Sequence, residues 1–111
     1  MHIPFNATKK IETEEAQIWD YLINKDIGIS YQELTMRGPI SGRYLNKECH
    51  EIYYVIKGSA KFFVGEDEYS VGEKDVVVVK PNIAHYIETE ELQYITITRP
   101  DWYEEQYEQV D

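Results

Sequence analysis

Three things are scarce in this sequence of 111 residues: cysteine, basic side chains and long apolar runs. Cys49 is the only cysteine, so an internal disulfide and a disulfide-rich scaffold are excluded, and we expect an inert thiol. No apolar run reaches the roughly 18 residues of a membrane-spanning helix. The amino terminus, MHIPFNATKKIE, has no apolar signal-peptide core. We therefore expect a protein of the reducing cytoplasm.

The scarcity of basic residues gives the chain a strong charge. Lysine and arginine number 11 against 21 aspartates and glutamates, for a net charge of −10 at neutral pH. A surface this acidic repels phosphate backbones and anionic lipid, which argues against nucleic-acid and membrane partners. The length suits one domain and leaves no space for a fused helix-turn-helix. Tyrosine is the residue in excess, with ten copies.

Apolar and polar residues alternate with period two from residue 27 onward, which predicts strands rather than helices. Turn residues separate the runs, and the clearest of the expected strands are 27–36, 51–56, 60–64, 76–79, 84–88 and 92–98. The unbroken valine run at 76–79 predicts a strand that is covered on both faces. Seven or eight short strands of this kind predict an all-β sandwich or small barrel.

The two ends of the chain differ from this pattern. Residues 13–23 allow a helix beginning at Thr13, with two glutamates in its first turn, or a strand with aromatic and apolar residues on one side. The tail, residues 101–111, carries large aromatic side chains among carboxylates, namely Trp102, Tyr103 and Tyr107. We expect these rings to pack back onto the body, with a lid or a partner-binding arm as the alternative.

Two short motifs stand in order between Gly38 and His85. Glycine, glutamate and glycine recur as Gly38, Glu51 and Gly58 around the strand HEIYYVIKG, and DVVVVKPNIAH then ends at His85. In these motifs the sequence resembles the cupin superfamily, in particular its small one-domain members. The resemblance implies an all-β jelly-roll barrel, a double-stranded β-helix. It also implies one domain over 1–111, with an N-terminal extension (1–26), a barrel (27–98) and a C-terminal tail (99–111), and a homodimer.

The resemblance also implies a metal site, but an incomplete one. Cupins commonly hold a divalent ion with three histidines and a glutamate, of which only Glu51 and His85 remain here. Tyr44 and Asn46 stand at the other two histidine positions. An amide is a weak ligand for transition metals, and a phenol must first lose its proton. Metal binding by these four residues stays open, and no strong site is expected.

Two family glycine positions also differ, because Lys74 and Asn82 occupy them. Asparagine tolerates the left-handed backbone that a glycine would adopt, so the second change is mild.

The same positions suggest a pocket. Glu51 and His85 form the candidate acid–base pair, and Tyr44, Asn46 and Tyr53 are candidate pocket residues, Tyr53 because alternation places it on the inward face with Glu51. Rings and hydroxyls together suit a small polar, sugar-like ligand. Equally, Glu51 could be a buried carboxylate satisfied by tyrosines, and His85 could bond only a backbone carbonyl.

Three functions are therefore open. The first is a binding protein or metal-independent enzyme acting on such a ligand, with proton transfer as the reaction. The second is a metal-dependent isomerase or dioxygenase with an atypical ligand set. The third is a ligand-sensing module.

Overall fold

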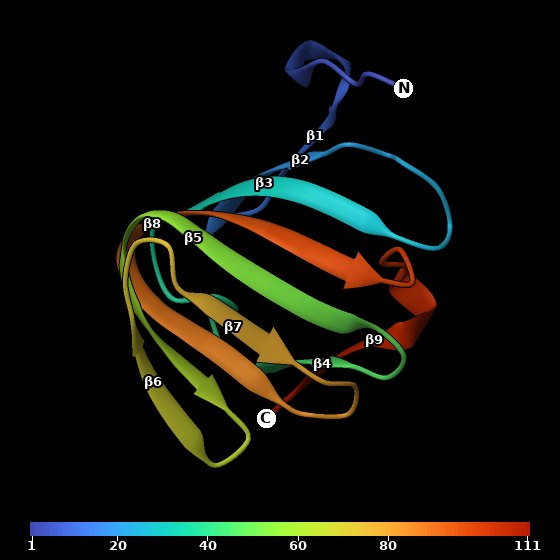
Figure 1. Cartoon of the computed structure of the whole chain (residues 1–111). Coiled ribbons are helices and arrows are strands. Elements are labelled where there is room, and N and C mark those ends of the chain that lie inside the picture. Colours follow the sequence, from blue (N-terminus) through green and yellow to red (C-terminus); the bar gives the residue numbers. More distant parts are fainter.

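The computed structural model describes all 111 residues, and nine strands form a single sheet (Figure 1). The strands are β1 (Lys9–Glu12), β2 (Ala16–Asp20), β3 (Gly28–Leu34), β4 (Arg43–Asn46), β5 (His50–Val64), β6 (Asp67–Val71), β7 (Val76–Val79), β8 (His85–Arg99) and β9 (Tyr107–Val110). Two single turns of 3₁₀ helix complete the chain, η1 (Phe5–Ala7) and η2 (Glu104–Gln106). No helix of the structure is long and apolar enough to span a membrane.

The sheet is organised around β5 and β8, which have 15 residues each and pair antiparallel along most of their length. β5 also pairs with β6 and β7, whereas β8 pairs with β3 and β4, and β1, β2 and β9 extend the edges. Because both long strands bend and change partners along their length, the sheet curls around an interior (Figure 1). The all-β barrel predicted from the sequence is confirmed.

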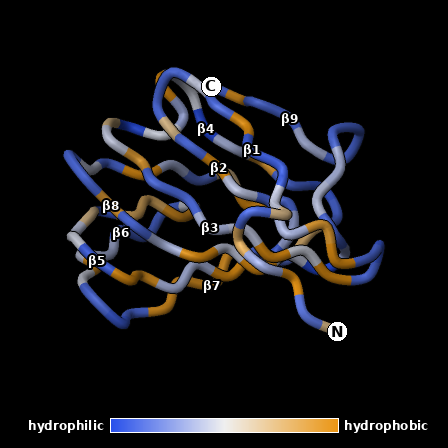
Figure 2. Tube along the Cα trace, turned by 90° about the horizontal axis from the view of Figure 1, so that it is seen from above, coloured by the Kyte–Doolittle hydropathy of each residue, from blue (hydrophilic) through white to orange (hydrophobic).

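Over much of the long strands, side chains alternate between buried and more exposed positions, so about every second one lies inside. Along the trace in Figure 2, hydrophobic segments are interspersed with hydrophilic ones. Thirteen buried apolar residues form one core, among them Tyr53, Val55, Phe62, Ile87, Leu92 and Tyr94. Other inward positions of β5 and β8 carry polar residues, such as Glu51 and Thr96, which lie together at one side of this core. This is where the candidate site lies.

The sequence predicted one strand before Lys57–Gly58 and another after them, but β5 runs through these residues without ending. The ladder to β8 instead shifts register between Val55 and Lys57 and again between Ser59 and Lys61. Gly58 adopts a φ of 95° with its α-carbon against the carbonyl of Glu91, so a side chain would be strained and crowded there. The glycine marks a bulge rather than a strand end. Likewise β8 joins the two strands predicted at 84–88 and 92–98.

The helix predicted from Thr13 is wrong, and the alternative strand is correct. Thr13 lies between β1 and β2, where its hydroxyl accepts a hydrogen bond from the backbone N–H of Ala16 at 3.0 Å. β2 then pairs with β3, with Trp19 opposite Tyr31. Pairing with a neighbouring strand therefore overrides the helix-start signal of the threonine and glutamates.

The prediction that the valine run is covered on both faces is also wrong. Val77 and Val79 are buried, but Val76 and Val78 are 55% and 53% exposed. Their cross-strand partners are apolar too, so two rows cross β7, β5, β8 and β3 on the outside of the sheet. We call this the outer apolar face; its residues are Val76, Tyr54, Ile95 and Tyr31 in one row and Val78, Ile52, Ile97 and Ile29 in the other.

The expectation for Asn82 is confirmed, and that for the tail holds for β9 and Tyr107. β9 pairs with β4, and the ring of Tyr107 lies beside that of Tyr44 with centroids 6.1 Å apart, whereas Trp102 and Tyr103 are 45% and 39% exposed. Asn82 has a φ of 65°, and Lys74, at the other family glycine position, has a φ of 70°. Both family glycine positions therefore correspond to left-handed backbone in this chain.

Candidate functional site

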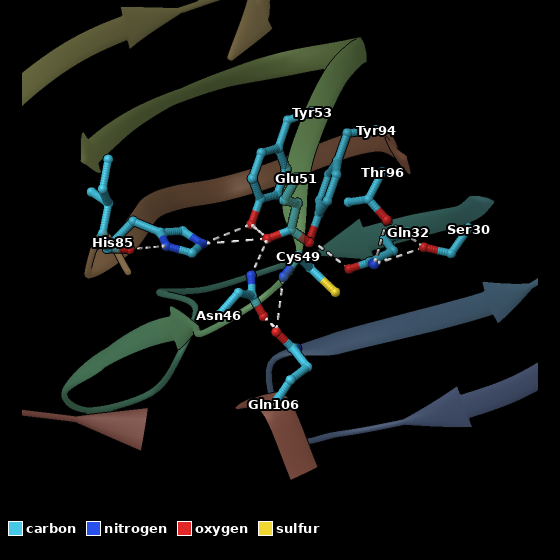
Figure 3. Close-up of polar contacts among 11 residues, drawn as sticks. Ser30, Gln32, Asn46, Cys49, Glu51, Tyr53, His85, Tyr94, Thr96 and Gln106 are labelled. Atoms are coloured by element: carbon cyan, nitrogen blue, oxygen red, sulfur yellow. Dashed lines mark hydrogen bonds and ion pairs between the residues drawn. The ribbon is translucent and has the colours of Figure 1, made fainter. Parts of the chain in front are cut away.

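A cavity of about 350 Å³ opens between the inner faces of β2, β3, β5 and β8 and the tail. Its walls combine rings with hydroxyl, amide and carboxylate groups. Tyr44, Asn46, Glu51 and Tyr53 line it, so four of the five residues predicted from the sequence face the same space. His85, the fifth, does not line the cavity and is fully buried behind Glu51 and Tyr53 (Figure 3).

Glu51 is held through one of its two oxygens. Oε1 accepts hydrogen bonds from the hydroxyl of Tyr53 at 2.8 Å and from Nδ2 of Asn46 at 3.3 Å, and it lies 3.4 Å from Nε2 of His85. Oε2 takes part in none of these contacts, and the side chain keeps 13% of its surface exposed. The carboxylate is thus fixed in orientation while one oxygen remains available to a ligand.

His85 has one fixed proton position. Its Nδ1 lies 3.2 Å from the carbonyl oxygen of Ile83, which can only accept, so Nδ1 carries a hydrogen. Nε2 then faces the hydroxyl of Tyr53 at 3.1 Å and Oε1 of Glu51 at 3.4 Å. His85 can therefore act on a bound molecule only through Tyr53 and Glu51.

Glu51, Tyr53 and His85 form a triangle that can hold a second proton besides the phenolic one. Tyr53 has a single hydroxyl proton, which it donates to Oε1 of Glu51 in the shortest of the three contacts. The contacts of Nε2 of His85 with the hydroxyl of Tyr53 and with Oε1 of Glu51 then have no hydrogen between them, unless a further proton sits on Nε2 or on Oε1. The triangle is thus a place where one proton can be taken up or released beside the cavity.

The buried tyrosines act as hydrogen-bond donors. Burial raises the pKa of Tyr53 well above its usual range, and the negative charge of Glu51 adds to this. Burial likewise raises the pKa of Tyr94, and that of Tyr44, where the charge of Glu15 contributes next. All three phenols keep their protons at neutral pH.

Across the cavity from His85 lies a second polar group, which we call the hydroxyl–amide cluster: Ser30, Gln32, Tyr94 and Thr96 (Figure 3). Tyr94 donates to Oε1 of Gln32 at 2.8 Å, and Nε2 of Gln32 donates to the hydroxyl of Ser30 at 2.9 Å. Ser30 and Thr96 share a hydrogen bond of 2.6 Å. Sequence reasoning missed these residues, although their inward positions on β3 and β8 were a usable signal.

Gln106, from η2 in the tail, supports the site from below. Its Nε2 donates to Oδ1 of Asn46 at 2.9 Å, and its Oε1 accepts from the backbone N–H groups of Glu48 and Cys49 at 3.2 Å each. The side chain is only 3% exposed. Nothing in the polar tail sequence distinguished Gln106 from its neighbours.

Cys49 lies under this contact and donates to the carbonyl of Pro100 at 3.3 Å. Burial raises the pKa of the thiol to about 11, with the charge of Glu51 as the next cause. Little thiolate exists at neutral pH, as expected for an inert cysteine.

These residues do not fit a resident transition metal, which needs three or four converging donors. Glu51 and His85 supply two, with the hydroxyl of Tyr53 bonded to both. Asn46 turns an N–H toward Glu51, because its oxygen accepts from Gln106. Tyr44 keeps its proton, since burial raises its pKa. Nowhere do three or more histidine, cysteine, aspartate or glutamate side chains gather closely enough to hold an ion.

Comparison with known families identifies the fold. Residues 31–98 match the cupin domain family, which covers more than half of the chain. The chain belongs to the cupin family. The motifs between Gly38 and His85 therefore correctly indicated the family of this protein.

Solved structures agree with this cupin barrel. Pac13, described as a nucleoside dehydratase, is 15% identical, with a TM-score of 0.86 over 99% of this chain and 90% of that one. A variant of Pac13 from Streptomyces, solved with uridine, gives 15% identity and a TM-score of 0.85 over the same shares. Bacillus subtilis oxalate decarboxylase is 19% identical over 95% of this chain and 30% of its own, with a TM-score of 0.75. At such identities the likeness establishes the fold alone. No curated protein matches the sequence.

Proposed function

We propose that this cupin binds a small polar molecule, of the size of a sugar or a nucleoside, in the cavity beside Glu51. A cavity of about 350 Å³ lies within the usual range for small-molecule sites. Rings of Trp102, Tyr107 and Tyr44 offer flat surfaces, and the hydroxyl–amide cluster offers neutral donors and acceptors. The free oxygen of Glu51 carries the proposal, because it gives a ligand hydroxyl or amide a fixed acceptor.

The similarity to Pac13 supports a ligand of this size. Its barrel superimposes on nearly the whole of this chain, and a variant of it has been solved with uridine. A nucleoside combines a planar base with a hydroxylated sugar, which are the two kinds of surface that the cavity walls recognise.

The Glu51–Tyr53–His85 triangle favours a second, more specific function: proton transfer to or from the bound molecule. Oε2 of Glu51 would exchange the proton with the ligand, and His85 would accept or return it through Oε1 or the hydroxyl of Tyr53. Isomerisation or epimerisation of a sugar carbon has this form. It requires no resident metal, so treatment with a chelator should leave it unchanged.

The test is Glu51→Gln, which keeps the shape of the side chain but cannot take up a proton. We expect turnover to fall by roughly 10²-fold or more while the protein stays folded. Ligands would first be found by thermal shift against a library of sugars and nucleosides. Proton transfer would then be followed by NMR as exchange of ligand C–H for deuterium in D₂O.

Glu66→Gln, at the exposed β5–β6 turn, is the matched control and should behave as the parent protein. Retained exchange in a folded Glu51→Gln protein would refute the catalytic role, and a library without any binder would refute the binding function.

A further inference from the structure

Building on the binding function proposed above, we propose that the cavity accepts uncharged ligands and rejects their phosphorylated or carboxylated counterparts. The selectivity comes from carboxylates placed around the cavity. Four of them line it, and they are Glu15, Asp20, Glu51 and Asp101. They come from the β1–β2 turn, β2, β5 and the tail, so they surround the space from several elements.

Two of these charges act on the same interior. Tyr94 and Tyr107 both line the cavity, and burial is the main cause that raises the pKa of each. The negative charges of Glu15 and Glu51 raise both pKa values further, after a contribution from Tyr44 in the case of Tyr94. The charge of Glu15 therefore acts on the same tyrosines as the charge of Glu51, although Glu15 belongs to the turn between β1 and β2, far from Glu51 in the sequence.

The other two carboxylates, Asp20 and Asp101, lie close enough for their negative charges to repel each other. Burial raises the pKa of Asp101, and the charge of Asp20 raises it further. Asp101 packs against the α-carbon of Gly28, where a side chain would collide with its carboxylate. An anionic ligand entering beside this pair would add to a repulsion that already exists.

The lining contains no lysine, arginine or histidine. From behind it, His85 contacts Glu51, and the charge of Arg37 has the smallest of the effects on the pKa of Tyr44, so Glu15, Asp20 and Asp101 have no basic partner in the wall. Arg37 stacks on the ring of Tyr86, 4.2 Å from its centroid, and Lys10 pairs with Glu12 at 2.9 Å. Phosphate and carboxylate groups are usually held by arginine, lysine or a helix N-terminus, whereas strands and the tail form these walls.

The groups that can hold a ligand are instead neutral. Ser30, Gln32 and Thr96 offer hydroxyl and amide groups, which suit the hydroxyls of a sugar or the amide edge of a base. A neutral molecule gains these contacts without electrostatic cost, whereas a phosphate ester brings a dianion among carboxylates. We expect an affinity difference of about 100-fold at low salt, and less at high salt.

The experiment compares matched pairs by isothermal titration calorimetry in a phosphate-free buffer: uridine with uridine 5′-phosphate, and ribose with ribose 5-phosphate. In the parent protein the uncharged member should bind and the phosphate ester should bind about 100-fold more weakly. Asp101→Asn and Glu15→Gln should each improve binding of the ester by roughly fivefold relative to binding of the uncharged member. Glu66→Gln, remote from the cavity, should change neither.

The outcomes separate this inference from the binding function. An ester that binds as tightly as its uncharged partner would overturn the selectivity and leave the binding function standing. Variants that leave the ratio unchanged would also overturn it, because the carboxylates would then not be its cause. If no member of either pair and no library compound binds, the binding function itself fails, and the selectivity with it.

Discussion

Tyr53 is the residue on which the polar part of the site depends. Its ring packs edge-on against Phe62 and lies beside Tyr94, with centroids 5.0 Å and 5.7 Å away, so it belongs to the core. Its hydroxyl nevertheless joins the two titratable groups of the site, Glu51 and His85. The ring of Tyr53 therefore contributes to packing and its hydroxyl to the proton network. A substitution that removes only the hydroxyl oxygen can test the second role apart from the first.

Tyr53→Phe should keep the ring and lose the link between Glu51 and His85. We expect the free energy of unfolding to fall by about 1–2 kcal/mol, because a partly buried carboxylate and a fully buried imidazole lose a partner. Urea denaturation measures this, and proton exchange with a ligand should slow while ligand binding persists.

Tyr69→Phe is the matched control, since that hydroxyl is exposed and makes only a 3.4 Å contact with Asp67. A loss of stability no greater than that of Tyr69→Phe would show that the Tyr53 hydroxyl contributes nothing to the network.

Among the elements, η2 and β9 of the tail connect the site to the end of the chain. β9 extends the sheet by pairing with β4, and Gln106 of η2 reaches under Asn46, which in turn contacts Glu51. The tail is therefore part of the support of the carboxylate rather than a detached arm. Trp102 of the same tail also lines the cavity.

Gln106→Ala should weaken this support. The buried N–H of Cys49 and Oδ1 of Asn46 would lose their partner, so we expect about 2–4 kcal/mol of destabilisation in urea, together with weaker ligand binding. Gln109→Ala, in the same tail, removes only an exposed bond to the carbonyl of Ser41 and should cost less than about 0.5 kcal/mol. Equal effects of the two changes would contradict the supporting role of Gln106.

The strands themselves show what could be predicted from the sequence. Alternation and the motifs around Glu51 and His85 correctly predicted the barrel and its family, because a period of two is a local signal. The continuity of β5 through Gly58 could not be predicted, since a glycine at a bulge and a glycine at a turn look alike. The burial of His85 behind Tyr53, and the contribution of Gln106, depend on contacts between distant segments that leave no local pattern.

At the scale of the whole molecule, the outer apolar face contrasts with the net charge of −10. Its two rows place apolar side chains directly opposite one another across four strands, and Tyr54 and Ile56 on β5 are 39% and 38% exposed. An apolar surface that extends over several strands is usually covered by a partner. A second copy of this chain is the partner we propose, because an apolar face can pack on the same face of another copy about a two-fold axis and family resemblance predicts a homodimer.

Val78→Lys should separate such a dimer, because it places a charge at the end of one row, on a side chain that is already 53% exposed. Light scattering after size exclusion should give a dimer mass for the parent protein and a monomer mass for the variant, with unchanged circular dichroism. Glu66→Gln changes the net charge by the same amount away from this face and should stay dimeric.

The two acidic copies repel each other, so raising the salt concentration should strengthen the parent dimer, whereas an association based on ion pairs would weaken. A parent protein that is monomeric at high salt and micromolar concentration would rule out this use of the face.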